Sequence, residues 1–196
     1  MRILALLALF ALLALGCARP LVVKPPPQAT QEQRAATVVT ALKTFGRSGD
    51  WLVRRGYHGT DHAISLLTNA PFSHAAVLDL DREQVIEADG QGGVHLSSLE
   101  EFARASHRLW LLRPAWWTPE RGAEAVLKAR DWVGRKYDFT GLAGLNDPHR
   151  LYCSELCVQA YRPWIPKGAH LPPVIPPGTM HDWATVLWDS GPELQP

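Results

Sequence analysis

Apolar and polar residues recur along the chain at two spacings, one typical of helices and one typical of strands. Residues 31–45 place apolar side chains on one helical face and are followed by Gly46, a common helix end. A second helix is expected at residues 118–132, where Pro119 opens the segment and Gly134 stops it. Further helices are expected at residues 60–67, 97–106 and 151–161.

Short apolar runs between these segments read as strands. Residues 73–80 and 84–88 form a hairpin-like pair joined by three charged residues, and residues 94–96 follow a glycine-rich turn. Other strands are expected at residues 49–54, 107–113 and 185–188. Meandering strands mixed with helices indicate an α+β domain with a central antiparallel sheet and flanking helices.

The beginning of the chain reads as an export signal. Met1 and Arg2 form a short basic start, residues 3–15 are wholly apolar, and Gly16 and Cys17 follow. The apolar run is shorter than the roughly 18 residues expected of a spanning helix. Its end resembles a bacterial lipoprotein signal, in which Cys17 is lipidated and becomes the new N-terminus. An ordinary signal peptide with an incidental cysteine is the alternative.

The segment after Cys17 has the composition of a tether. Residues 18–30 contain four prolines, which keep a chain extended and make it a spacer. The residue after Cys17 is Ala18 and not aspartate, and by resemblance to enterobacterial lipoproteins this favours the outer membrane. We therefore expect a protein of the bacterial cell envelope that faces the periplasm and is held to the membrane by a lipid anchor.

Composition and charge narrow the possible partners. The 196 residues are 46% apolar, which is enough for one domain with a real core. The formal net charge of +1 argues against nucleic acid as a main partner, because binding to backbone phosphates needs a basic surface. The sequence has no glycine-rich phosphate loop and no internal repeat, and nothing in it indicates an oligomeric state.

Three residues far apart in the sequence suggest covalent acyl-transfer chemistry. Cys153 stands at the start of a helix-like run, where the positive end of the helix dipole stabilises a thiolate. His74 opens one strand of the expected hairpin, and Glu87 lies on the other strand. A histidine can take the thiol proton, and a neighbouring carboxylate can hold the imidazole in place. The alternatives are a buried inert cysteine, a hydrogen-bonded wall histidine and a surface glutamate.

The remaining cysteine and a pair of histidines carry less information. Cys157 lies one helical turn after Cys153, and we interpret it as a small buried apolar residue, not as a disulfide partner or a metal ligand. His58 and His62 are four positions apart and could share a helix face, but Gly59 interrupts that helix and no third ligand is evident. We predict no metal and no cofactor.

Five segments in this order resemble the circularly permuted branch of the NlpC/P60 superfamily of papain-like cysteine hydrolases, specifically the YiiX/YebB-like group. The segments are residues 49–53, 73–78, 85–88, 134–138 and 152–156. In ordinary members the cysteine precedes the histidine, whereas here it follows. The resemblance implies a permuted papain-like fold, with Cys153 as nucleophile, His74 as base and Glu87 as the orienting residue.

The resemblance completes the expected domain organisation. We expect a signal peptide at residues 1–16, a lipidated N-terminus with its tether and leading helix at 17–45, and the hydrolase domain at 46–196. Two segments match no pattern of the family. They are residues 141–150 and the proline-rich residues 163–177, which we interpret as an ordered surface wrap or a mobile cover.

The expected function is hydrolysis of an amide bond in a peptide, plausibly a cell-wall peptide such as that of peptidoglycan. An acyl ester or thioester of a lipid is an alternative substrate, for a hydrolase or an acyltransferase, and a non-catalytic binding lipoprotein is another alternative. Glu155 could contact a substrate ammonium or cap its own helix, and we favour a structural role. Tyr137 and Asp138 are expected to pack the site and not to act in it.

Overall fold

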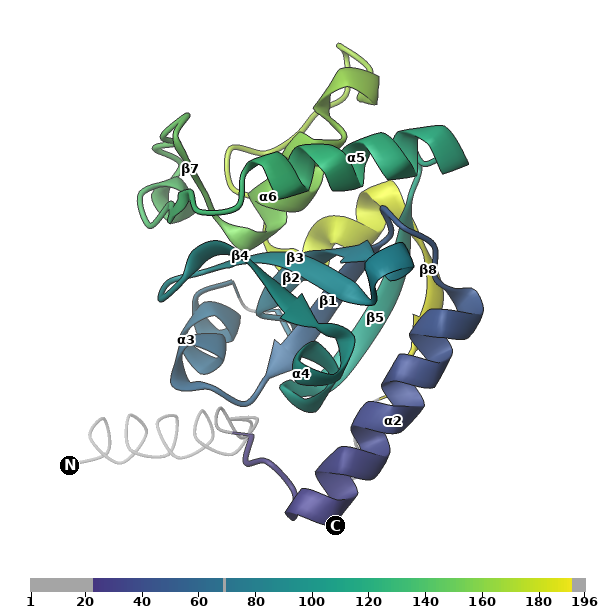
Figure 1. Ribbon diagram of the computed structural model, residues 1–196. Helices are drawn as coiled ribbons and strands as arrows, with labels where there is room; N and C mark the ends of the chain where they lie inside the picture. Colours follow the sequence, from purple (N-terminus) through teal and green to yellow (C-terminus); the bar gives the residue numbers. More distant parts are fainter. Residues whose placement is uncertain (1–22, 69, 192–196) are drawn as a thin grey trace, which may run out of the picture.

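The computed structural model describes residues 23–68 and 70–191 of the chain (Figure 1). The predicted signal peptide and Cys17 lie outside these residues. Over the described ranges, the structure contains no helix with both the length and the apolar character that a membrane crossing requires.

A six-stranded sheet forms the centre of the domain, in the order β4-β3-β2-β1-β5-β8. All neighbouring strands in it are antiparallel. The strands are β1 (Trp51–Gly56), β2 (His74–Asp79), β3 (Gln84–Asp89), β4 (Gly93–Ser98), β5 (Ser106–Pro114) and β8 (Ala184–Asp189). This confirms the predicted α+β class with a central antiparallel sheet, and each predicted strand is present with its ends shifted by a few residues.

Helices cover both faces of this sheet, so that the domain has two apolar cores (Figure 1). On one face lie α2 (Gln28–Phe45) and α4 (Leu99–Arg104), and on the other lie α5 (Pro119–Asp131) and α6 (Cys153–Ala160). Successive strand residues point to opposite faces, so Leu52 packs on the α4 side while Val53 packs on the α6 side. The two faces are called the α4 side and the α6 side below.

Local sequence signals account for the positions of these helices. Ser98 begins α4 with a reciprocal capping box, because its hydroxyl accepts from the Glu101 N–H while the Glu101 carboxylate accepts from the Ser98 N–H. Thr118 caps α5, and Gly46 ends α2. The predicted N-terminus of α2 was three residues late, since the helix already begins at Gln28.

The remaining elements connect these strands and helices, and among them α3 confirms the helix predicted at residues 60–67. They are α3 (Gly59–Thr68), η1 (Leu80–Arg82), β6 (Lys136–Tyr137), η2 (Gly141–Ala143), β7 (Arg150–Leu151), η3 (Arg162–Trp164) and η4 (Pro177–Trp183). β6 and β7 form a small parallel pair that the sequence pattern did not predict. This pair delivers the chain directly to the start of α6.

The proline-rich segment is an ordered wrap against α6. The Ile175 N–H donates to the Tyr152 hydroxyl at 3.1 Å, and the Ser154 hydroxyl donates to the Ile175 carbonyl at 2.5 Å. Tyr152 and Ser154 stand on either side of Cys153 in the sequence. The wrap therefore holds both neighbours of the candidate nucleophile.

Candidate active site

Cys153 is the first residue of α6, which begins within two positions of the predicted start. Tyr152 before it has extended backbone angles, and the helix hydrogen-bonding begins with the Leu156 N–H donating to the Tyr152 carbonyl at 2.9 Å. N–H groups in the first turn of a helix have no partner within the helix and carry its positive end. Cys153 is 2% exposed, and both it and Cys157 are free thiols, as the sequence analysis expected.

His74 is held at the beginning of β2 by the residue before it. The Ser73 N–H donates to the Arg54 carbonyl at 2.9 Å, and the Ser73 hydroxyl donates to the Asp61 carboxylate at 2.6 Å. His74 itself is paired with Arg54 of β1 and is buried. These contacts fix the strand end from which the imidazole projects.

Glu87 contacts His74 across the predicted hairpin, but not from the position directly opposite. The strand register places Glu87 opposite Ala76, so His74 is its diagonal neighbour on the same face. The His74 Nε2 and Glu87 Oε2 atoms are 2.6 Å apart. The structure therefore brings together two of the three predicted site residues through the sheet itself.

The third residue, Cys153, reaches the same imidazole from the α6 side. Burial raises the pKa of the Cys153 thiol, but its hydrogen bond and charge interaction with His74 outweigh burial and lower that pKa. Burial lowers the pKa of His74, but hydrogen bonds to Cys153 and Glu87 raise it to about 9. Opposite shifts of this kind favour a thiolate–imidazolium pair. Since Nε2 faces Glu87, Nδ1 is the ring nitrogen left for the sulfur.

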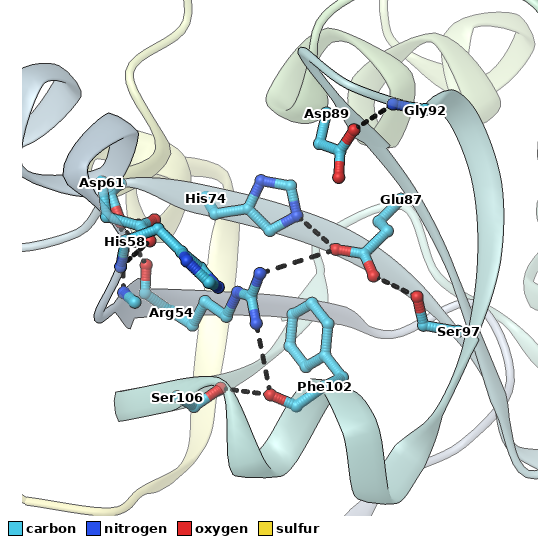
Figure 2. A network of polar contacts seen from close by, with 12 residues as sticks. Arg54, His58, Asp61, His74, Glu87, Asp89, Gly92, Ser97, Phe102 and Ser106 are labelled. Atoms are coloured by element: carbon cyan, nitrogen blue, oxygen red, sulfur yellow. Dashed lines mark hydrogen bonds and ion pairs between the residues drawn. The ribbon is translucent and has the colours of Figure 1, made fainter. Parts of the chain in front are cut away.

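Glu87 is enclosed by polar groups from three strands (Figure 2). The Ser97 hydroxyl donates to Oε1 at 2.5 Å, His95 Nε2 is 3.6 Å from the same oxygen, and Arg54 Nη2 is 3.8 Å from Oε2. Burial raises the pKa of Glu87, but His74, Arg54 and Ser97 together lower it to about 2. Glu87 is therefore a carboxylate in the folded protein at neutral pH.

A comparison with known protein families agrees with this geometry. Residues 47–167 match a family model described as "Permuted papain-like amidase enzyme, YaeF/YiiX, C92 family". The chain belongs to this family. Membership confirms the predicted permuted papain-like fold. The wider NlpC/P60 relationship stays a resemblance.

A solved structure has a fold similar to that of this chain. The chain resembles a crystal structure described as that of the metalloprotein YiiX from Escherichia coli O157:H7, with a TM-score of 0.51 and 22% sequence identity. The match covers 61% of this chain and 66% of that one, just under two thirds of its length. A search of curated proteins finds no match.

Tyr137 was expected to pack the site, but its interaction with the Cys153 thiol was not predicted. Burial raises the pKa of Tyr137, and its charge interaction and hydrogen bond with Cys153 raise it further. The N–H groups of Ala75 and Ser154 also lower the pKa of the Cys153 thiol. The signal available in the sequence was the position of Tyr137 in a segment shared with the family. Its contact with Cys153 depends on the unpredicted pairing of β6 with β7.

Asp138 and Glu155 have the structural roles expected for them. Asp138 is fully buried and accepts from the N–H groups of Gly141 at 2.8 Å and Asp147 at 2.9 Å, so it organises the loop before the nucleophile. The Glu155 carboxylate accepts from the Tyr152 N–H at 3.4 Å and thereby caps α6. Burial raises the pKa of Glu155 to about 7.

The two histidines considered as metal ligands do not share a helix face. α3 begins at Gly59, so His58 lies before the helix, and the His58 N–H donates to Asp61 at 3.0 Å. Nδ1 of His62 accepts from the Arg55 guanidinium at 3.0 Å. In the part of the chain that the structure describes, no group of three His, Cys, Asp or Glu side chains is arranged to hold a metal ion.

Proposed function

We propose that the protein hydrolyses an amide bond with Cys153 as nucleophile, His74 as general base and acid, and Glu87 as the group that orients His74. The observation that carries this proposal is that Cys153 from α6 and Glu87 from β3 both interact with the imidazole of His74 from β2. The opposite pKa shifts of the thiol and the imidazole supply a nucleophilic thiolate at neutral pH.

The geometry supports a two-step reaction. The Cys153 thiolate attacks the carbonyl carbon, and the N–H groups at the start of α6 stabilise the negative charge that develops on the carbonyl oxygen. The Tyr137 hydroxyl, which interacts with Cys153, is a further donor on this side. His74 then gives its proton to the leaving amine, and a thioester forms. A water molecule, deprotonated by His74, attacks the thioester and releases the acid and the thiolate.

A peptide of the cell wall is the substrate that fits the expected compartment best. The support is the export signal read from residues 1–17, since an exported bacterial enzyme meets that polymer. The test is mass spectrometry of the purified protein incubated with cell-wall fragments and, separately, with lipid extracts. New amino and carboxyl termini in the wall peptides support the proposal. Intact peptides together with released fatty acids contradict it.

One feature favours an acyl ester or thioester as a second candidate substrate. Phe139, Leu142 and Leu145, in the loop between β6 and β7, are 61%, 40% and 71% exposed. The Phe139 ring packs edge-to-face on Tyr137 with centroids 4.9 Å apart, and Tyr137 contacts Cys153. An exposed apolar surface next to a nucleophile suits an apolar acyl chain. Release of fatty acid in the same experiment would favour this candidate.

We also propose that the protein is a lipoprotein anchored through Cys17. The support is the apolar run that ends at Gly16-Cys17 and the proline-rich spacer after it. A bacterial lipoprotein N-terminus carries several acyl chains, so the protein should stay with membranes through a salt wash. C17S should lose lipid labelling and either stay unprocessed or become soluble. Wild-type protein found as free periplasmic material without lipid would refute this anchor and leave the amidase proposal intact.

A further inference from the structure

Arg54 is a largely buried cation beside the candidate site, and the proposed mechanism does not use it. It lies on β1 in register with His74, and its side chain is 11% exposed. The guanidinium lies 4.4 Å from the centroid of the Phe102 ring, and Nη1 donates to the Phe102 carbonyl at 3.3 Å. Nη2 is 3.8 Å from Glu87 Oε2, the oxygen that contacts His74 (Figure 2).

The burial of Arg54 is costly for the fold. Its Nε atom is buried and has no hydrogen-bond partner among the described residues. A buried charge with an unsatisfied donor is destabilising, and an apolar residue of similar size often packs a core better. The neighbouring position on the same face of β1, Leu52, is apolar and fully buried. Packing alone therefore does not account for an arginine at position 54.

The charge balance of the site explains why an arginine stands at position 54. In the proposed resting state, Cys153 and Glu87 are negative, while His74 and Arg54 are positive, so the four buried groups sum to zero. When Cys153 is acylated and His74 has lost its proton, Glu87 and Arg54 still form a neutral pair. Without Arg54, the buried site would carry a net negative charge in both states.

We infer that Arg54 is a positioning residue for the proposed reaction, which keeps Glu87 ionised and limits how strongly Glu87 holds the proton of His74. This inference rests on the proposed roles of Cys153, His74 and Glu87. Arg54 acts through Glu87 and need not touch the substrate.

The direction of the effect follows from the groups that face His74 and Glu87. Arg54 from β1, His95 from β4, Glu101 from α4 and Cys153 from α6 interact with His74 or Glu87 directly. Asp89 from β3 acts on His95, and Tyr137 from β6 acts on Cys153. Among these, Arg54 lowers the pKa of both His74 and Glu87 by its charge. A less basic His74 is a better proton donor to the leaving amine.

The experiment measures His74 in the full-length protein without substrate. The imidazole nitrogens are followed by NMR through a pH titration, with the His74 signal assigned by its loss in H74A. R54Q should move the deprotonation midpoint of His74 upward from about 9 by about one pH unit. R54K, which retains the charge but cannot stack a planar guanidinium on Phe102, should keep the midpoint near that of the wild type.

The matched control is R108Q. Arg108 also contacts a carboxylate, Asp189, at 2.6 Å and an aromatic ring, Trp110, at 5.5 Å, but it lies on β5 away from the site. R108Q should leave the His74 midpoint unchanged. If R54Q does not fold, R54M replaces it, because methionine fills the space above Phe102 without a new polar group, and the same shift is expected.

The outcomes separate this inference from the proposed function. An unchanged His74 midpoint in folded R54Q or R54M overturns the role of Arg54, even if the wild type cleaves amides. An upward shift in a protein that cleaves neither peptides nor acyl lipids supports the electrostatic role and refutes the proposed function. Failure of both R54Q and R54M to fold also overturns the inference, because Arg54 would then serve the fold.

Discussion

The two faces of the sheet contribute different kinds of group to the same site. The α6 side supplies Cys153 from the end of a helix that is otherwise packed in an apolar core. The α4 side supplies a polar network of Glu87, Ser97 and Arg54 from neighbouring strands. His74 lies at the end of β2, between the two faces. It interacts with Cys153 on one side, and on the other its ring centroid is 6.0 Å from that of Phe102. The difference indicates that one face provides the reacting atom and the other sets its proton chemistry.

The largest effect should come from removing the reacting atom. C153A should lower turnover by about a thousandfold or more, because no other group supplies the nucleophile. C157A, one helical turn away in the same core, is the matched control and should keep most of the activity. Turnover is measured on the cleaved peptide, and thermal unfolding checks that both variants fold. Near-normal turnover in C153A would show that the α6 side does not provide the nucleophile.

Changes on the α4 side should have smaller effects that appear in proton transfer. E87Q should lower turnover by roughly ten- to a hundredfold, less than H74A, because the glutamine leaves His74 in place without a charge to hold its proton. The His74 midpoint should fall below about 9 in E87Q, opposite to the rise expected for R54Q. NMR titration of E87Q and R54Q measures the direction in which each variant shifts the deprotonation midpoint of His74. Shifts of the same sign would contradict the division of roles.

The pH dependence of the rate should reflect the titration of both His74 and Cys153. The active pair needs a thiolate and an imidazolium, so the rate should fall above about 9 as His74 loses its proton. It should also fall on the acid side as the thiolate takes up a proton, with a midpoint below the ordinary thiol value of 9.0. The measurement is kcat/KM against pH. A rate that rises steadily through pH 10 would exclude the ion pair.

The loss of stability at low pH should depend on Glu87 and not on Cys153. Its folded-state pKa of about 2 lies below the ordinary 4.5, so its contribution to stability is present above pH 4.5 and is lost as the pH falls toward 2. The free energy of unfolding of the wild type should therefore fall over this range more steeply than that of E87Q. C153A should retain the steep fall. Chemical denaturation at several pH values gives the comparison, and equal slopes for wild type and E87Q would contradict it.

The smallest effect should come from the cap of α4, which supports the network without joining it. S98A removes the hydroxyl that accepts from the Glu101 N–H and should cost about 1 kcal/mol of stability. Thermal or urea unfolding measures this loss. The His74 midpoint should stay at about 9, because Ser98 does not contact Glu87 or Arg54 in the described structure. A shifted midpoint would show that the position of the helix also tunes the site.

The parts of the site predicted from sequence are those set by local pattern. The hairpin of β2 and β3 follows from two short apolar runs with a charged connection, and it placed His74 beside Glu87. The exact register was not predictable, because it depends on the 3₁₀ turn η1 and on Glu83, which has a positive φ of 52°. The start of α6 was predicted within two residues.

The parts that were not predicted depend on contacts between distant segments. Tyr137 reaches Cys153 through strands of only two residues, which carry no periodic signal. Arg54 reads in the sequence as a charged residue in a strand, and its partner Phe102 is 48 positions away. A single sequence shows neither the depth of such a residue nor the group that neutralises it.

The hydrogen bonds of Ile175 to the two neighbours of Cys153 have a consequence for the order in which the site is assembled during synthesis. His74, Glu87 and Arg54 all leave the ribosome before the nucleophile, so the proton-handling half can fold first. Ser154 and Tyr152 find their partner only 21 and 23 positions later. A chain that ends before Ile175 contains every proposed reacting group. It lacks the segment that binds both neighbours of Cys153 and so positions the thiol. Incomplete chains are therefore expected to be poor hydrolases.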